Sequence, residues 1–228
     1  MAVRKMLFRI ARSKPMGCLI GKAAQYCPSA IPARKVYLDK WVVAFRHPVP
    51  SYEQHAVFLP RKWIRSVLQV QDTGLLRRVL KAAEQAAQSS GWSDRPLMFC
   101  VNAGRRQDVG QLHFHLVSLK EALVYDMGET ETLPRELAGC MVCGTGKRFV
   151  IRSTPSAEDT DELIWQHLLR AAVTFCTEAA REMDLSREGF SLRILKRPSQ
   201  CTFDKVIYLD FDRAIMERRT NHESSSHL

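Results

Sequence analysis

The segment from Gln111 to Val117 (Gln-Leu-His-Phe-His-Leu-Val) alternates polar and apolar residues without a break. Because successive side chains of a β-strand point to opposite faces, the pattern predicts a strand whose polar face carries Gln111, His113 and His115. The two histidines would lie about 7 Å apart along such a strand. This spacing suits a nucleophile with a supporting neighbour, or a metal pair. The alternative is two half-exposed histidines on an ordinary strand.

Patterning elsewhere predicts an α+β fold. An amphipathic helix is expected from Leu75 to Ser89, followed by Gly91 as its stop. A second long amphipathic helix is expected from Glu162 to Asp184. The expected strands cover residues 35–38, 41–45, 54–59, 97–101, 111–118, 148–151, 190–195 and 205–211.

The order helix, strand, polar loop, strand occurs twice, in residues 75–118 and 168–212, and Leu-Leu-Arg stands at the start of both stretches. This predicts a diverged internal repeat. The alternative is that any α+β chain repeats such elements. The second copy has no histidine in its last strand, so it is not expected to form an equivalent active site.

The net charge of +10 is concentrated near the N-terminus, since residues 1–38 contain eight Lys or Arg and no Asp or Glu. The remaining residues are almost balanced, so a basic nucleic-acid-binding face is not expected on the folded body. Residues 1–14 (MAVRKMLFRIARSK) resemble a mitochondrial targeting segment, which predicts a mitochondrial location. The alternative is a disordered basic arm on a cytoplasmic protein. The sequence has no apolar run near the roughly 18 residues of a membrane helix.

The seven cysteines are scattered, which is typical of free thiols in a reducing compartment. Cys140 and Cys143 form a single Cys-x-x-Cys, and a zinc site would need two further ligands. Whether these two cysteines bind zinc is left open. We expect no metal and no cofactor at the histidines.

The chain resembles the histidine-triad (HIT) superfamily over residues 17–118. The family signature is His-φ-His-φ-His-φ-φ, where φ is apolar, and Gln111–Val117 matches it with glutamine in the first position. The segment His55–Lys62 is similar to the family's His-φ-φ-φ-φ-Pro-Lys-Lys stretch. Residues 17–22, 31–37 and 41–45 resemble the opening of the nucleoside-phosphoramidase branch.

This resemblance implies a nucleotide hydrolase or nucleotidyltransferase. The middle histidine, His113, would attack the α-phosphate and form a nucleotidyl-histidine that water or an acceptor cleaves. The other catalytic positions implied are Gln111, His115 and His55. The substrate-binding positions implied are Gln107, Asn102, Asp108 and Val109 in a phosphate-binding loop, with Phe45 and His47 nearby.

Four positions depart from the family pattern. Gln111 replaces the first histidine, although its amide can still donate to a phosphate oxygen. His47 stands where the phosphoramidase branch has an aspartate that grips the ribose. Trp63 replaces a further histidine, and Asp108 stands where a serine is usual. The alternative function is therefore a catalytically inactive HIT-like structural or nucleotide-sensing subunit of a mitochondrial assembly. The expected partner is a nucleotide or nucleoside phosphate conjugate, not a membrane and not a nucleic acid.

The expected organisation is a HIT-like antiparallel meander sheet with helices, arranged as an intrachain pseudo-dimer in a monomer and not as a homodimer. We expect a targeting-like or disordered arm in residues 1–14, a HIT-like domain with the site in 15–120 and a crossover in 121–147. A degenerate HIT-like half should follow in 148–212, and a flexible tail in 213–228.

Overall fold

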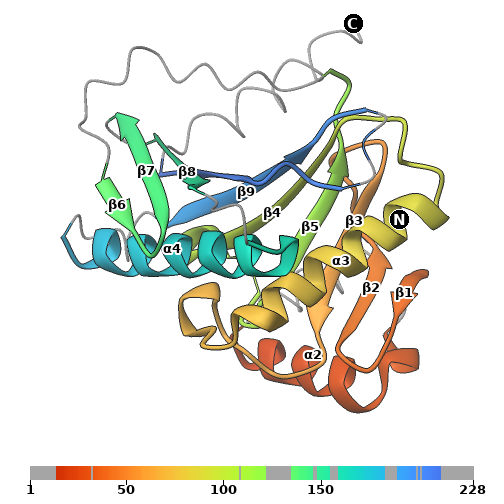
Figure 1. Ribbon diagram of the computed structural model, residues 1–228. Helices are drawn as coiled ribbons and strands as arrows, with labels where there is room; N and C mark the ends of the chain where they lie inside the picture. Colours follow the sequence, from red (N-terminus) through yellow and green to blue (C-terminus); the bar gives the residue numbers. More distant parts are fainter. Residues whose placement is uncertain are drawn as a thin grey trace, which may run out of the picture.

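A continuous ten-stranded sheet forms the centre of the fold in this computed structural model (Figure 1). The structure describes residues 14–31, 33–107, 109–121, 135–145, 148–154, 159–182, 189–198, 200 and 202–211. The strand order is β1-β2-β3-β5-β4-β9-β10-β8-β7-β6, and all neighbouring strands are antiparallel. The strands are β1 (Lys35–Leu38), β2 (Val42–Arg46), β3 (His55–Pro60), β4 (Leu97–Ala103), β5 (Phe114–Ser118), β6 (Arg135–Leu137), β7 (Cys140–Thr145), β8 (Arg148–Ser153), β9 (Phe190–Lys196) and β10 (Val206–Asp210).

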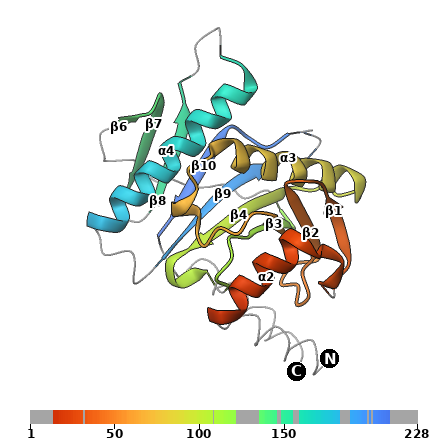
Figure 2. The same ribbon diagram turned by 90° about the horizontal axis from the view of Figure 1, so that it is seen from below.

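Two amphipathic helices, α3 (Thr73–Ser89) and α4 (Asp161–Glu182), cover one face of this sheet (Figures 1 and 2). Their buried stripes pack on alternate strand residues in a single apolar core. The helix α3 matches the amphipathic helix that the sequence predicts from Leu75 to Ser89. In α4, Trp165 is fully buried whereas Leu163 is 36% exposed. The α+β class and the antiparallel sheet predicted from the sequence are confirmed.

A third helix, α2 (Lys14–Tyr26), packs on the opposite face of the sheet and was not expected from the sequence. Its Ala24 is buried against Val43, Phe45 and Leu59, which alternate with the core residues Val42, Ala44 and Phe58. Figure 2 shows α2 on the other side of β2 and β3 from α3. We call the face that α2 partly covers the histidine face, because His55 and His115 also point to it.

The internal repeat is visible as a repeated strand order. The first half runs β1-β2-β3-β5-β4 and the second β6-β7-β8-β10-β9, and the halves meet where β4 pairs with β9. The bounds of β3 and β8 are 93 residues apart (55 to 148), as are those of β4 and β9 (97 to 190). Cys100, which pairs with Arg193 across the junction, is also 93 residues from its partner. A pseudo-two-fold axis therefore passes through this pair.

Two strands of the second half lie in the range that we expected to be a crossover, residues 121–147. They are β6 and β7, and β7 pairs along its length with β8. Their short length and mixed composition gave no clear period in the sequence. Residues 122–134 and 146–147 of this range, residues 1–13 of the expected arm and the expected tail in 213–228 lie outside the described residues. Among the described helices, none combines the length and apolar character needed to cross a membrane.

The strand β7 also bears on the Cys-x-x-Cys pair. Cys140 is fully buried in the core under α4, and Cys143 lies three residues further along the same strand. Residues three apart on a strand point to opposite faces, so the two thiolates cannot bind one ion without breaking the strand. Burial raises the pKa of Cys140 to about 11, which keeps this side chain a neutral thiol.

Candidate functional site

Four histidines meet on the histidine face where β3 lies beside β5. His115 lies in β5, His113 directly precedes that strand, and His55 begins β3. His47, just beyond β2, stacks on His55 with 4.0 Å between ring centroids and an interplanar angle of 4°. The rings of His113 and His115 are edge to face, with centroids 5.0 Å apart. Three histidines that the sequence analysis assigned to catalysis, together with His47, are thus neighbours in space.

A backbone carbonyl fixes the ring of His113. Its Nδ1 lies 2.8 Å from the carbonyl oxygen of Gln111, and both residues are buried. A carbonyl can only accept, so Nδ1 carries the hydrogen, and in neutral imidazole Nε2 therefore carries the lone pair. The arrangement leaves a nucleophilic nitrogen on the side of the ring away from the main chain.

The ring of His115 carries its hydrogen on the other nitrogen, Nε2, because of a hydrogen bond from His55. The backbone N–H of Ser51 donates to Nδ1 of His55 (3.3 Å), so the hydrogen of neutral His55 is on Nε2. That nitrogen lies 2.9 Å from Nδ1 of His115, to which it donates. The hydrogen of His115 is therefore on Nε2. One backbone donor thus makes His115 a hydrogen-bond donor beside the lone pair of His113.

Burial keeps both members of this pair neutral. It lowers the pKa of His55 from 6.5 to about 3, with a smaller contribution from the nearby His47. Burial also lowers the pKa of His115 well below its ordinary value, and His113, His55 and His47 add to the shift. A charged imidazole here would lose its hydration and face other imidazoles. At neutral pH, His55 and His115 therefore act as oriented N–H donors without charge.

The nitrogen atoms of His47, His55 and His115 lie within 4.8 Å of one another, a spacing at which three imidazoles could share a metal ion. However, the backbone N–H of Val49 donates to Nδ1 of His47 (3.2 Å), as Ser51 does to His55. Metal-binding histidines normally donate from the nitrogen that does not bind the ion. Here an ion on the two Nε2 atoms would require both tautomers to change and both backbone hydrogen bonds to break. The cluster is better suited to an anionic group than to a cation.

Gln111 does not donate to the site as expected. Its amide nitrogen faces the carbonyl oxygens of Pro60 (3.5 Å) and Lys62 (3.3 Å), and its oxygen faces the N–H of Ile64 (3.4 Å). The side chain is completely buried. Gln111 therefore fastens the start of β5 to the segment that follows β3. The sequence could not show this, because the carbonyls come from a distant segment.

The predicted phosphate-binding loop lies between β4 and β5, but Gln107 is also engaged with the main chain. Its amide nitrogen donates to the carbonyls of Arg65 and Val109 (2.8 Å for Val109). Its side chain therefore shapes the loop instead of projecting a free donor from it. Asn102, at the end of β4, accepts a hydrogen bond from Ser191 Oγ (2.7 Å). Asp108 lies outside the described residues.

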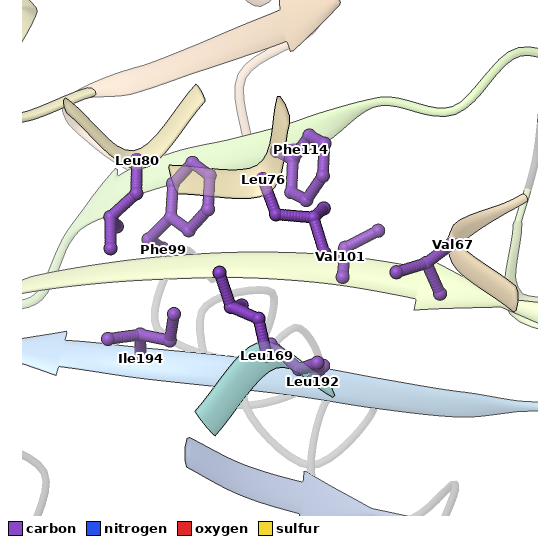
Figure 3. Close-up of a pocket in the computed structure, with 9 residues that line it drawn as sticks. All are labelled: Val67, Leu76, Leu80, Phe99, Val101, Phe114, Leu169, Leu192 and Ile194. Atoms are coloured by element: carbon purple, nitrogen blue, oxygen red, sulfur yellow. The ribbon is translucent and has the colours of Figure 1, made fainter. Parts of the chain in front are cut away.

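Phe45 is buried in the apolar cluster beneath α2, with Val43, Leu59 and Ala24. It supports the wall of the histidine face and is only 3% exposed. A small cavity elsewhere, between the sheet and helices α3 and α4, is lined only by apolar side chains such as Phe99, Phe114 and Leu169 (Figure 3). It lies on the opposite face of the sheet from the histidines and offers no polar group to a substrate.

The second half has no counterpart of this cluster. Because Arg193 pairs with Tyr208 as Cys100 pairs with His115, the residue equivalent to His115 is Tyr208. By the same offset of 93, Val206 stands in place of His113 and Arg148 in place of His55. The described residues thus contain one histidine cluster, as the sequence predicted.

Two parts of the site region were missed in the sequence. The stack of His47 on His55 was not foreseen, although the closeness of His47 to a strand end was a usable signal. The contacts of Arg106 with Ser191 Oγ (3.3 Å) and with the carbonyl oxygen of Asp210 (3.1 Å) join positions about a hundred residues apart. No local pattern could predict these contacts.

Comparison with known proteins agrees with this fold. A family model described as HIT domain matches residues 29–122. A HIT family hydrolase from Legionella pneumophila Philadelphia 1 is 34% identical, and its match covers 48% of this chain and 98% of that chain, with a TM-score of 0.40.

Two structures from Arabidopsis thaliana extend over both halves. One is an ADP-glucose phosphorylase with bound ADP-glucose, 8% identical, covering 82% of this chain and 78% of that chain with a TM-score of 0.59. The other is a GalT-like protein, 8% identical, covering 78% of this chain and 77% of that chain with a TM-score of 0.55. At this identity they show the fold alone, and the extent of the match is compatible with an architecture of two HIT-like halves.

Proposed function

The chain belongs to the histidine-triad (HIT) superfamily, and we propose that it is a nucleotide-binding hydrolase or nucleotidyltransferase acting on a nucleoside phosphate conjugate. The observation that carries this proposal is the hydrogen bond between Nδ1 of His113 and the carbonyl of Gln111 (2.8 Å). It places the hydrogen of neutral His113 on Nδ1, and the lone pair that would attack phosphorus is therefore on Nε2. It also stabilises the positive charge that develops on the ring, because Nδ1–H then donates more strongly.

In the first step, Nε2 of His113 attacks the α-phosphorus and the bond to the leaving group breaks. The leaving group departs with the electron pair and takes up a proton, and a nucleotidyl-histidine remains on His113. In the second step, the oxygen of water or of an acceptor attacks phosphorus, loses its proton, and returns the electron pair to Nε2. Splitting one displacement into two steps is the usual gain of covalent catalysis.

His115 supports both steps as a donor. Its ring is edge to face with that of His113, and the hydrogen on Nε2 is set by His55. A neutral donor beside a nucleophile can bind a non-bridging phosphate oxygen, or the leaving atom, without transferring its own proton to the nucleophile. The low pKa of His55 is consistent with this fixed direction of donation.

The test is turnover of adenosine 5′-phosphoramidate, a diadenosine polyphosphate and ADP-glucose by the wild type and by His113→Ala. We expect the variant to lose turnover of whichever compound the wild type cleaves, and to lose an acid-labile label transferred from the α-phosphate. His167→Ala, on α4, is the control and should keep both. Turnover by His113→Ala at the wild-type rate would refute the assignment of the nucleophile.

A second candidate function is a catalytically inactive nucleotide-sensing subunit of a mitochondrial assembly. It is favoured by one observation: the amide nitrogens of Gln107 and Gln111 are both engaged by backbone carbonyls, which removes two expected phosphate donors. A wild type that turns over none of the three compounds, yet unfolds at higher temperature with AMP, would support this candidate. Saturating ligand at 100 times its Kd would add about 2.7 kcal/mol to the free energy of unfolding.

A further inference from the structure

Residues 104–107, which follow β4 and which we call the 104–107 loop, pack against the second half of the chain. Gly189 directly precedes β9 and has a φ of +76°. A Cβ atom at this position would lie 2.4 Å from the carbonyl oxygen of Ala103 and 2.9 Å from the backbone nitrogens of Arg105 and Arg106. Glycine is therefore required here twice, for its backbone conformation and for the close approach of the loop.

A polar network continues this contact. Ser191 donates from Oγ to Oδ1 of Asn102 (2.7 Å) and accepts from the guanidinium of Arg106 (3.3 Å). Arg106 also donates to the carbonyl oxygen of Asp210 (3.1 Å). Ser191 is 1% exposed, so these hydrogen bonds are made away from competing water. Both ends of the turn at residues 102–106 are thus fixed to β9 and β10.

The same loop is linked to the histidine site by further hydrogen bonds along the chain. Gln107 follows Arg106 directly and holds the loop through its hydrogen bonds to the carbonyls of Arg65 and Val109. Four residues later, Gln111 supplies the carbonyl that orients His113. The chain of contacts therefore runs from the second half, through the turn, to the nucleophile.

We propose that the second half, which has no counterpart of the histidine cluster, positions the 104–107 loop for the substrate's phosphate, with Gly189 and Ser191 as the positioning residues. This inference rests on the proposed function of the site. The second half would then contribute to the reaction although it has no active site of its own. A displacement of about 1 Å in such a loop is enough to reduce catalysis by roughly 100-fold.

The experiment compares Gly189→Ala with Gly91→Ala. Gly91 ends α3 with a φ of +70°, and a Cβ atom there would meet nothing within 4 Å. Both variants suffer the same kind of backbone strain, but only Gly189→Ala pushes on the loop. We expect Gly189→Ala to raise KM for adenosine 5′-phosphoramidate roughly tenfold or more while Gly91→Ala leaves it unchanged. A simple loss of folded protein would lower kcat at constant KM instead.

Hydrogen exchange of the unliganded protein gives a second readout. Amides of residues 103–107 should exchange at least about tenfold faster in Gly189→Ala than in Gly91→Ala, with α3 unaffected in both. If KM and loop exchange of the two variants agree within about twofold, the inference is wrong. Should Gly189→Ala fail to fold, Ser191→Ala, which leaves the backbone unchanged, decides by the same criteria.

The two readouts separate this inference from the proposed function. A wild type without turnover would refute the proposed enzyme but not the exchange comparison, which needs no substrate. Rapid loop exchange in the variant with unchanged KM would show that the loop is held by the second half but does not serve the phosphate, and would overturn the inference.

Discussion

The imidazole of His55 is neutral in the folded protein at pH values where it would be charged in an unfolded chain. Its pKa falls to about 3 on folding, and that of His115 falls in the same direction. Between pH 6.5 and about 3 the unfolded state therefore binds more protons than the folded state. The free energy of unfolding should decrease as the pH is lowered through this range.

We predict that wild-type stability, measured by urea unfolding at pH 7, 6, 5 and 4, decreases as the pH falls, and that His55 contributes up to about 1.4 kcal/mol per pH unit once the pH is well below 6.5. His55→Gln should show a shallower slope, because this group no longer titrates. His167→Gln is the matched control and should keep the wild-type slope. Equal slopes in wild type and His55→Gln would contradict the predicted protonation of His55 on unfolding.

For single residues, the sequence predicted which histidines lie together better than it predicted the contacts that each site residue makes. Alternation placed His113 and His115 on one face, and the resemblance added His55. The two glutamines were assigned as phosphate donors, yet Gln107 and Gln111 donate to main-chain carbonyls. An amide's partner depends on which backbone atoms come near in three dimensions, and local sequence does not contain that information.

Among the elements, α2 depends most on its surroundings. It contains two glycines, Gly17 and Gly21, which disfavour a helix in isolation. Gly21 lets the helix approach Gln111, since a Cβ there would lie 2.7 Å from Oε1 of Gln111 and 2.5 Å from Cδ1 of Trp63. Trp63 is 46% exposed and can move, but Gln111 is completely buried and cannot.

We predict that Gly21→Ala destabilises the protein by about 1–2 kcal/mol, although it raises helix propensity by about 1 kcal/mol. The clash with Gln111 should exceed the gain in propensity. Urea unfolding measures the difference, with Lys22→Ala on the exposed side of the same helix as control, expected within about 0.5 kcal/mol of wild type. A more stable Gly21→Ala protein would show that α2 can move away from Gln111 at little cost.

The elements that the sequence predicted carry a clearer apolar signal than those it missed. The helix α3 has a continuous apolar stripe, and the strands β3, β4 and β9 are runs rich in apolar residues that are buried along most of their length. The helix α2 and the short strands β6 and β7 are formed by packing and pairing with neighbours, β6 and β7 at the edge of the second half. Tertiary contacts decide such segments, so local propensity was a poor guide.

For the molecule as a whole, the pairing of β4 with β9 joins two half-sheets within one chain. In a protein with a single half, β4 would be an edge strand with unpaired backbone groups, available to another copy. Here that edge is already covered, and β1 and β6 form the outer edges of the sheet.

We predict that the protein is a monomer, with a mass near 26.0 kDa. Sedimentation equilibrium at several concentrations is the measurement, since it reports mass independently of shape. A mass that doubles across the micromolar range would show that an outer edge or another surface pairs two chains, and would contradict the intrachain arrangement as the complete assembly.

Cys100 and Arg193 face each other at the junction of the two halves, on the pseudo-two-fold axis. In an assembly of identical subunits, any residue on a rotation axis must face its own copy. Arg193 is 3% exposed and forms an ion pair with Asp210 (3.1 Å), while the residue opposite it is the neutral Cys100. Two separate copies of either half would set arginine against arginine or cysteine against cysteine. When the two halves belong to one polypeptide, the two residues on the axis can differ. A buried arginine can therefore lie on the axis without facing a second arginine.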